Sequence, residues 1–139
     1  MDKNQGICTN ALIFNDRNEI LIVKRSNKDI SFPDEWELAG GGIKYKETPE
    51  KSIIREVKEE CGLDIEVKIP ITVSVFYIGK KQYFEITYLT KLKNNNQKIT
   101  LSNEHSQYKW IRFEDIDSSN LNTYIKEILI QAKNVLNNN

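Results

Sequence analysis

Three glutamates close together in the chain are the residues whose types and spacing best suit chemistry. Glu56, Glu59 and Glu60 stand at positions i, i+3 and i+4, so a helix would place them on one face. Like charges at this spacing repel each other by about 0.2–0.5 kcal/mol per pair. The pattern indicates either a solvated acidic face or a site for a hard cation, because Mg²⁺ and Mn²⁺ are bound by carboxylate oxygens.

Three consecutive glycines, Gly40, Gly41 and Gly42, precede these glutamates. They suit a turn that needs positive φ, and they equally suit a backbone that approaches a metal or a phosphate where a side chain would obstruct it. They do not form a Walker loop, because no Gly-Lys-Ser/Thr sequence follows them. The sequence alone leaves both roles open.

Start and stop signals bracket the segment that carries the glutamates. Thr48 can cap a helix, and Pro49 fits the first helical position because its missing N–H would have no partner there. Gly62 can adopt the left-handed conformation that ends a helix, and Leu63 can fold back onto it. We therefore predict a helix over 49–61. Its predicted apolar stripe consists of Ile53, Ile54, Val57 and Cys61.

Together these residues resemble the Nudix box, Gly-x5-Glu-x7-Arg-Glu-U-x-Glu-Glu-x-Gly-U, in which U is aliphatic. Its seven fixed and two aliphatic positions would match a given random site with a probability on the order of one in 10⁹. Every position of the box is filled here, by Gly41, Glu47, Arg55, Glu56, Val57, Glu59, Glu60, Gly62 and Leu63.

The resemblance extends to the flanks of the box. RNEILIVKR (17–25), WELAGG (36–41) and NEHSQYKWIRFEDI (103–116) look like the MutT-type branch of the family, although Ala39 stands where many relatives have proline. The resemblance implies an α+β fold, the Nudix α/β/α sandwich, with a mixed β-sheet between the box helix and the C-terminal helix. It also implies a single Nudix hydrolase domain over 1–139.

The resemblance further implies roles for individual box residues. Arg55 would pair with and orient a box glutamate, and Glu47 would be a supporting carboxylate. Either Glu59 or Glu104 would accept a proton from the attacking water. The implied ligands of the divalent cation, Mg²⁺ or Mn²⁺, are Glu56, Glu59, Glu60, the Gly40 carbonyl and Glu104.

Residues outside the box carry weaker expectations, each with a simpler alternative. Glu104 could be one more exposed loop acid, and Arg25 either contacts substrate phosphate or is a charge at the end of a strand. Asn120 is a plausible N-cap of the last helix, and the resemblance offers it a role in contacting the base. His105, the only histidine, is expected to be a hydrogen-bonding loop residue.

The remaining elements follow from hydrophobic periodicity and turn residues. Strands at 6–14 and 19–25 flank NDRN, which is typical of a hairpin turn. In the strand predicted at 65–78, Pro70 marks an edge or a break. The other predicted strands are 36–38, 82–93, 99–101 and 108–113, and an amphipathic helix is predicted from about 120 to 136.

Composition and charge restrict the function classes. The 139 residues are 39% hydrophobic and 29% charged, which is typical of an ordinary globular protein. Twenty basic side chains balance twenty acidic ones, so no overall field attracts extended nucleic acid or an anionic membrane. We find no secretory signal or membrane span and expect a cytoplasmic location, with Cys8 and Cys61 as buried thiols.

The resemblance implies divalent-cation-dependent hydrolysis of the diphosphate linkage of a nucleoside diphosphate derivative. A (deoxy)nucleoside triphosphate, cleaved to the monophosphate and pyrophosphate, is the favoured substrate. The alternatives are ADP-ribose, a dinucleoside polyphosphate or an RNA 5′ end as substrate, or a non-catalytic domain that senses a nucleotide. The sequence is also compatible with a homodimer.

Overall fold

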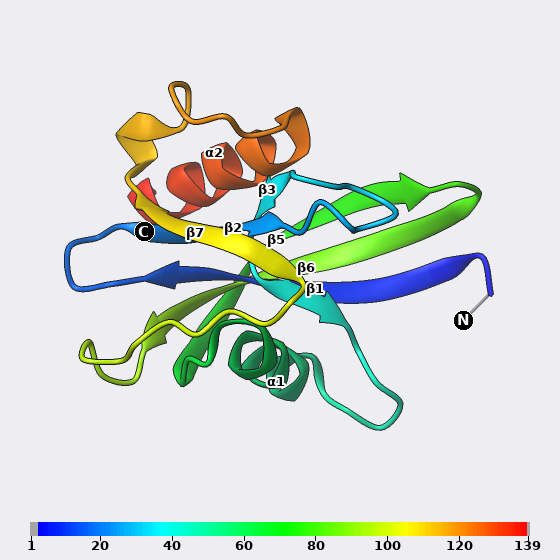
Figure 1. Ribbon diagram of the computed structural model, residues 1–139, viewed down its shortest axis with the longest axis horizontal. Coiled ribbons are helices and arrows are strands. Elements are labelled where there is room, and N and C mark those ends of the chain that lie inside the picture. The colour runs from blue at the N-terminus through cyan, green and yellow to red at the C-terminus, as the bar shows by residue number, and fades with distance from the viewer. Residues whose placement is uncertain (1–2, 139) are drawn as a thin grey trace.

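The computed structural model describes residues 3–138, which form one curled sheet between two α-helices (Figure 1). The strands are β1 (Gln5–Phe14), β2 (Ile20–Arg25), β3 (Trp36–Glu37), β4 (Gly40–Gly42), β5 (Ile65–Ile78), β6 (Lys81–Leu92) and β7 (His105–Ile111). The helices are α1 (Pro49–Cys61), the 3₁₀ helix η1 (Phe113–Asp115) and α2 (Thr123–Asn137).

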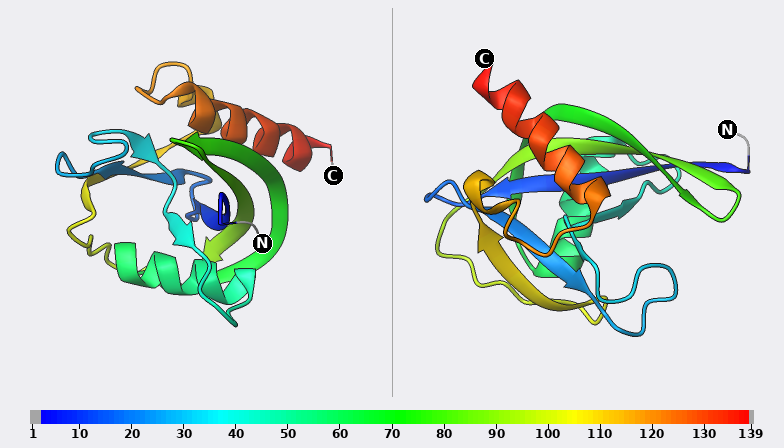
Figure 2. Two further views of the ribbon diagram at one scale, coloured as in Figure 1. Left: turned by 90° about the vertical axis from the view of Figure 1, so that its right-hand side faces the viewer. Right: turned by 90° about the horizontal axis from the view of Figure 1, so that it is seen from above.

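The sheet is mixed, as the resemblance predicts. Its strands lie in the order β3-β2-β1-β6-β5, while β4 also pairs with β1 and β7 also pairs with β2. β1 and β6 run parallel, and the other pairs are antiparallel. α1 covers one face of the sheet and α2 covers the other (Figure 2). The predicted α+β sandwich is therefore confirmed.

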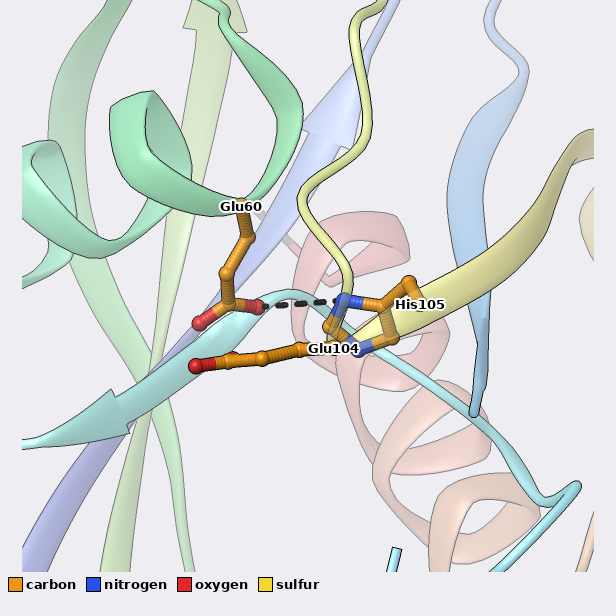
Figure 3. A group of neighbouring side chains, drawn as sticks. All are labelled: Glu60, Glu104 and His105. Carbon is orange, nitrogen blue, oxygen red and sulfur yellow. Dashed lines mark ion pairs between the residues drawn. The ribbon is translucent and has the colours of Figure 1, made fainter. Parts of the chain in front are cut away.

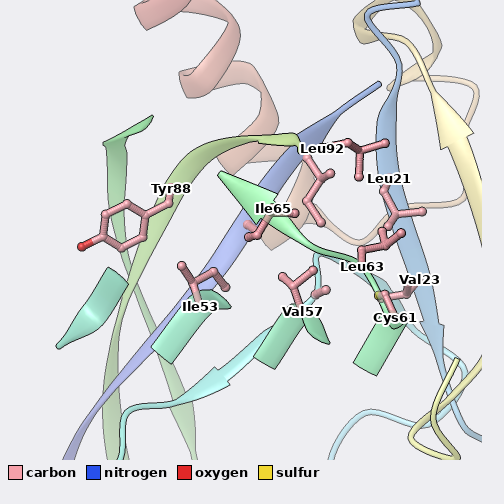
Figure 4. Close-up of a cluster of buried hydrophobic side chains, with 12 residues drawn as sticks. Leu21, Val23, Ile53, Val57, Cys61, Leu63, Ile65, Tyr88 and Leu92 are labelled. Carbon is pink, nitrogen blue, oxygen red and sulfur yellow. The ribbon is translucent and has the colours of Figure 1, made fainter. Parts of the chain in front are cut away.

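Alternation along β1 divides the core into two clusters. Ala11 and Ile13 belong to the cluster under α1, which includes Val57 of that helix (Figure 4). Leu12 points to the opposite face and packs in the cluster under α2, together with Ile128. Each helix thus buries its apolar side against its own face of the sheet.

The predicted box helix is confirmed at both ends. The Thr48 hydroxyl accepts a hydrogen bond from the Lys51 N–H at 3.2 Å. Gly62 adopts φ 70° and donates its N–H to the Lys58 carbonyl at 3.0 Å, closing the helix in the left-handed conformation that glycine favours. The sequence signals around Thr48 and Gly62 therefore specify α1 locally.

The predicted apolar stripe of α1 is wrong at one position. Ile53, Val57 and Cys61 are fully buried, but the side chain of Ile54 is 42% exposed. Ile54 follows Ile53 by about 100° around the helix, which carries it off the core face. Glu60 is only 2% exposed, so this carboxylate lies at the buried edge of the helix and not on a solvated face.

Two other predicted elements differ from the structure. Residues 99–101 are not a strand, because the Thr100 N–H donates to the Cys61 carbonyl and the Ser102 N–H to the Glu60 carbonyl, both at 2.9 Å. This segment is therefore held against the end of α1 instead of joining the sheet. β7 begins at His105, earlier than predicted.

The C-terminal helix begins later than predicted. Asn122 is its N-cap, with the side-chain oxygen accepting a hydrogen bond from the Ile125 N–H at 2.9 Å. Asn120 is exposed and precedes the helix, so its predicted capping role is wrong. The buried Leu121 separates the two asparagines and places only Asn122 at the first turn.

The structure also bears on the expectations for Pro70, for the two cysteines and for membrane spans. Pro70 lies on the edge strand β5 between two register shifts, as its residue type predicts. Cys8 and Cys61 are buried free thiols, as expected. Among residues 3–138, no helix is both long and apolar enough to cross a membrane.

Candidate active site at the Nudix box

The three glycines form strand β4, and their backbone lies close to its neighbours. None of the three has positive φ, which excludes the turn alternative. A Cβ atom on Gly41 would lie 2.7 Å from the Glu56 carboxylate, and one on Gly40 would lie 2.0 Å from the Thr9 carbonyl oxygen. Glycine is therefore required at Gly40 for close packing against β1, while the approach of this backbone to a metal or a phosphate stays a prediction.

Arg55 organises the acidic residues of α1. Its Nε and Nη2 atoms donate to the two oxygens of Glu47 at 2.7 and 2.9 Å, a bidentate pair. Its Nη1 atom donates to Glu56 at 2.9 Å and to Glu59 at 3.2 Å, and Nη2 also reaches the Gly42 carbonyl at 3.2 Å. One guanidinium therefore fixes three carboxylates and the end of β4.

The carboxylate of Glu47 is the best stabilised of these acids. Hydrogen bonds from Arg55, then from the Lys44 N–H, lower the pKa of Glu47 to about 2. Its two oxygens are thus occupied by donors that keep it charged, which fits a supporting role around Arg55.

Glu60 has the opposite environment. Its side chain is only 3% exposed, and one oxygen accepts a hydrogen bond from the Gly40 N–H at 3.3 Å. Burial, followed by the neighbouring Glu56 carboxylate, raises the pKa of Glu60 far above its ordinary value. Two carboxylates so close, one of them buried, favour a cation between them. This donor set fits Mg²⁺ or Mn²⁺.

Glu104 joins this group from the opposite side. Ligand atoms of Glu60, Glu104 and His105 all lie within 4.8 Å of one another (Figure 3). The Glu104 side chain is exposed, while its carbonyl accepts a hydrogen bond from the Ser26 N–H at 2.9 Å. The structure therefore brings Glu104 to the box although more than forty residues separate it from Glu60 in the chain.

Two other predicted ligands, Glu59 and the Gly40 carbonyl, are not shown to point at the acidic cluster. The side chain of Glu59 is 55% exposed and points to Arg55 on the outer edge of α1. Gly40 contacts Glu60 through its N–H, and a role for its carbonyl as a ligand stays a prediction.

A cavity of about 510 Å³ opens beside Gly40 and Gly41, on the α2 side of the sheet. Glu85 of β6 lines it and accepts a hydrogen bond from the Tyr124 hydroxyl at 2.9 Å. Burial raises the pKa of Glu85 to about 7. Asn10 lines the same cavity, and its amide oxygen accepts a hydrogen bond from the Thr87 hydroxyl at 2.6 Å.

Aromatic rings cover the outer part of this cavity. Phe76 lines it, stacks on Tyr83 with ring centroids 4.9 Å apart, and meets Tyr124 edge-to-face at 5.5 Å. A cavity with apolar walls and a few inward polar groups is the usual form of a small-molecule site. Gly40 and Gly41, which line it, also contact Glu60 and Glu56, so the cavity lies beside the acidic group.

Comparison with known proteins agrees with the box. The NUDIX domain family matches residues 5–131. The chain belongs to this family.

Relatives of this Nudix chain with curated names include nucleoside triphosphatases. NudI of Klebsiella pneumoniae (strain 342) is 26% identical over 129 residues, covering 86% of this chain and 91% of the relative. NudI of Escherichia coli O17:K52:H18 is 28% identical over 127 residues, covering 85% and 89%.

Solved structures give the same fold. The MutT protein of Methanosarcina mazei Go1 has a TM-score of 0.86 at 25% identity and covers 96% of both chains. A C. elegans Ap4A hydrolase has a TM-score of 0.80 at 21% identity, covering 96% of this chain and 99% of the other. At that identity the second likeness shows the fold alone.

Two Nudix residues predicted to contact substrate have different surroundings. Arg25 lines the cavity, but both oxygens of Glu37 hold its Nη1 atom at 2.9 and 3.1 Å, and Asp29 holds its Nη2 atom. It is therefore an engaged, partly buried cation and not a bare charge at a strand end. Asn120 does not line the cavity, whereas Asn122 does.

The sequence did not predict that Glu85, Asn10 and Tyr124 would line the cavity. The available signal was Glu85, a single acid in the otherwise uncharged run YFEITYLT of β6. A strand acid on the inner face requires a reason for its burial.

Proposed function

We propose that this Nudix chain hydrolyses (deoxy)nucleoside triphosphates to the monophosphate and pyrophosphate with a divalent cation. The observation that carries the proposal is the pair Glu56 and the buried Glu60 beside Gly41 and Gly40, two glycines that also line a cavity large enough for a nucleoside. The name of the NudI relatives, nucleoside triphosphatase, supports the substrate class.

Each box residue has a proposed role in this reaction. Glu56, Glu59, Glu60, Glu104 and the Gly40 carbonyl hold the cation, Mg²⁺ or Mn²⁺. When bound, the cation neutralises diphosphate charge and acidifies a water molecule. Arg55 keeps the Glu56 and Glu59 carboxylates aimed through the contacts described above.

The proposed reaction adds water to one phosphorus and breaks that atom's bond to the bridging oxygen. Glu59 or Glu104 accepts the proton of the water, since both carboxylates are exposed enough to reach it. The displaced oxygen leaves with the pyrophosphate.

The cavity is proposed to hold the nucleoside. Tyr124 occupies one oxygen of Glu85, so the other is able to accept an N–H of the base. The oxygen of Asn10 is occupied by Thr87, which leaves its –NH₂ group as a donor. Arg25 and Asn122 are proposed to contact the sugar or phosphates from the rim. The free, buried thiols of Cys8 and Cys61 fit the reducing cytoplasm that we propose as its location.

Product identification tests the proposal. The purified protein would be incubated with Mg²⁺ or Mn²⁺ and a panel of the common ribo- and deoxynucleoside triphosphates, ADP-ribose and dinucleoside polyphosphates, and products separated by ion-exchange chromatography. We expect a nucleoside monophosphate and pyrophosphate in equal amounts. Release of a nucleoside diphosphate and phosphate, or cleavage of ADP-ribose alone, would contradict the proposed substrate. Ligand-induced thermal stabilisation without any product would favour a sensing domain.

A further inference from the structure

In the imidazole of His105, Nε2 has a hydrogen-bond partner, and Nδ1 has none among the described residues. Its side chain is only 2% exposed. Nε2 lies 2.7 Å from an oxygen of Glu37, and both oxygens of Glu37 also accept from Arg25. A carboxylate engaged in this way only accepts hydrogen bonds, so Nε2 carries the proton.

The other nitrogen, Nδ1, is buried and lacks a hydrogen-bond partner among the described residues. Its nearest charged neighbour is Glu60 Oε1 at 3.7 Å, too far for a hydrogen bond. In the neutral ring Nδ1 therefore presents a buried lone pair that no described donor satisfies. A buried acceptor without a donor is unfavourable, and a cation bound between Nδ1 and the Glu60 carboxylate would satisfy it.

We propose that Nδ1 of His105 is a ligand of the divalent cation held by Glu60 and Glu104, and that this nitrogen shifts the site from Mg²⁺ toward Mn²⁺. The inference rests on the cation site of the proposed function. The chain's three candidate ligand atoms already lie within 4.8 Å of one another (Figure 3).

The distances suit a shared ion after a small movement. Two ligand atoms about 2.1 Å from one ion lie about 3.0 Å apart at a right angle and about 3.4 Å apart in a tetrahedral arrangement. The observed 3.7 Å between Nδ1 and Oε1 exceeds these two separations by about 0.3 and 0.7 Å. The exposed Glu104 carboxylate can complete the set without disturbing the core.

The contact with Glu37 supports a ligand role for the ring. Histidines that bind metals almost always donate their other ring N–H to a carboxylate or carbonyl, which fixes the tautomer and orients the ring. Glu37, itself held by Arg25, is placed to do this. Mg²⁺ prefers an all-oxygen shell, whereas a site that adds an imidazole nitrogen favours transition-metal cations over Mg²⁺.

The sharpest test uses the fact that His105 is the only histidine in the chain. Protein labelled with ¹⁵N-histidine and loaded with Mn²⁺ without substrate would be studied by pulsed electron paramagnetic resonance. We expect hyperfine coupling from one directly bound ¹⁵N nucleus. Bound Mn²⁺ with no ¹⁵N coupling would overturn the inference, and this measurement needs no variant.

Two variants extend the test to metal preference. His105→Gln keeps an N–H near the position of Nε2 for Glu37 but removes Nδ1, while His105→Asn keeps a polar atom near Nδ1. Titration calorimetry should show the Mn²⁺ over Mg²⁺ preference of the wild type reduced about tenfold or more in His105→Gln, and less in His105→Asn. Equal losses for both ions would indicate a structural role only and contradict the inference.

These measurements separate the inference from the proposed function. A protein that hydrolyses nucleoside triphosphates while its bound Mn²⁺ shows no histidine coupling contradicts only the inference. A protein that binds Mn²⁺ through His105 but releases no pyrophosphate contradicts only the proposed function.

Discussion

The polar residues on the two faces of the sheet differ in how far apart they lie in the sequence. Under α1, every acidic group of the box lies between Gly41 and Leu63, and helix geometry sets the spacing of Glu56, Glu59 and Glu60. Under α2, the Tyr124–Glu85 contact joins residues 39 apart, and the Thr87–Asn10 contact joins residues 77 apart. The box carboxylates are therefore specified locally, although Glu104 and His105 reach them from a distant segment, whereas the shape of the cavity depends on the whole fold.

This difference separates two kinds of substitution. Changes on the α1 face should affect the rate for every substrate, because they alter groups that act on the diphosphate. Changes on the α2 face should affect the choice among substrates, because they alter groups that face the variable part.

The largest effect is expected from removing the buried charge of the acidic pair. Glu60→Gln keeps the shape and the bond from the Gly40 N–H but removes an ionic ligand, so kcat should fall by about 10³-fold on every substrate. Glu56→Gln should behave similarly. Steady-state kinetics measure the rate, and thermal unfolding checks the fold.

Glu127→Gln, an exposed position on α2, is the matched control and should retain wild-type turnover. Since Glu60 is buried beside another carboxylate, its glutamine variant should unfold at the same or a higher temperature than the wild type. Wild-type turnover in both box variants would refute the assigned role of the α1 face.

A smaller effect is expected from adding one methyl group under α1. Gly41→Ala places a Cβ 2.7 Å from the Glu56 carboxylate, which must move, whereas a Cβ on Gly42 has nothing within 4 Å. We expect kcat to fall by about 10- to 100-fold in Gly41→Ala and to change by less than about twofold in Gly42→Ala. Both glycines lie in one strand, so equal rates in the two variants would show that the Glu56 position is unimportant.

Residues of the box could be predicted from sequence because the signals are contiguous. Thr48 and Gly62 fix the helix ends, and the spacing of Glu56 and Glu60 then follows. The burial of Glu60 could not be predicted, because its carboxylate packs beside Gly40 and His105, which are distant in the chain, while the 99–102 segment bonds to the end of α1. The same tertiary contacts explain why residues 99–101 are not a strand.

Failures on the α2 side have a common physical cause. Asn120 and Asn122 are both good capping residues by type, and tertiary packing around the buried Leu121 accompanies the choice of Asn122. Glu85 lies on β6, which pairs with β1 and places Glu85 opposite Cys8. No local sequence pattern predicts this pairing between distant segments. Periodicity predicts the strands, but it does not predict which side chains converge.

On the α2 face, Glu85→Gln should change substrate choice more than rate. The glutamine can still accept from Tyr124 but presents an N–H where the carboxylate presented an acceptor. The ratios of kcat/KM among nucleoside triphosphates with different bases should change by about tenfold, measured with one enzyme preparation across the panel. An equal loss of kcat/KM for all bases, of the kind expected for Glu60→Gln, would assign Glu85 a role in the reaction. It would contradict the proposed difference between the α1 and α2 faces.

The smallest expected effect is a pH-dependent change in stability at Glu85. Burial raises its pKa from an ordinary 4.5 to about 7, so between these values the folded protein holds a proton that the unfolded chain has released. Stability therefore falls as pH rises through this window, by at most about 3 kcal/mol. Glu85→Gln lacks this loss, so its unfolding free energy should match the wild type near the lower limit and exceed it above the upper limit.

Urea unfolding of both proteins across that pH range measures the difference in unfolding free energy, and Glu127→Gln should show no such difference. A constant difference at every pH would mean that Glu85 stays charged in the folded protein, and that the cavity is wetter than its lining of Phe76 and Leu38 indicates.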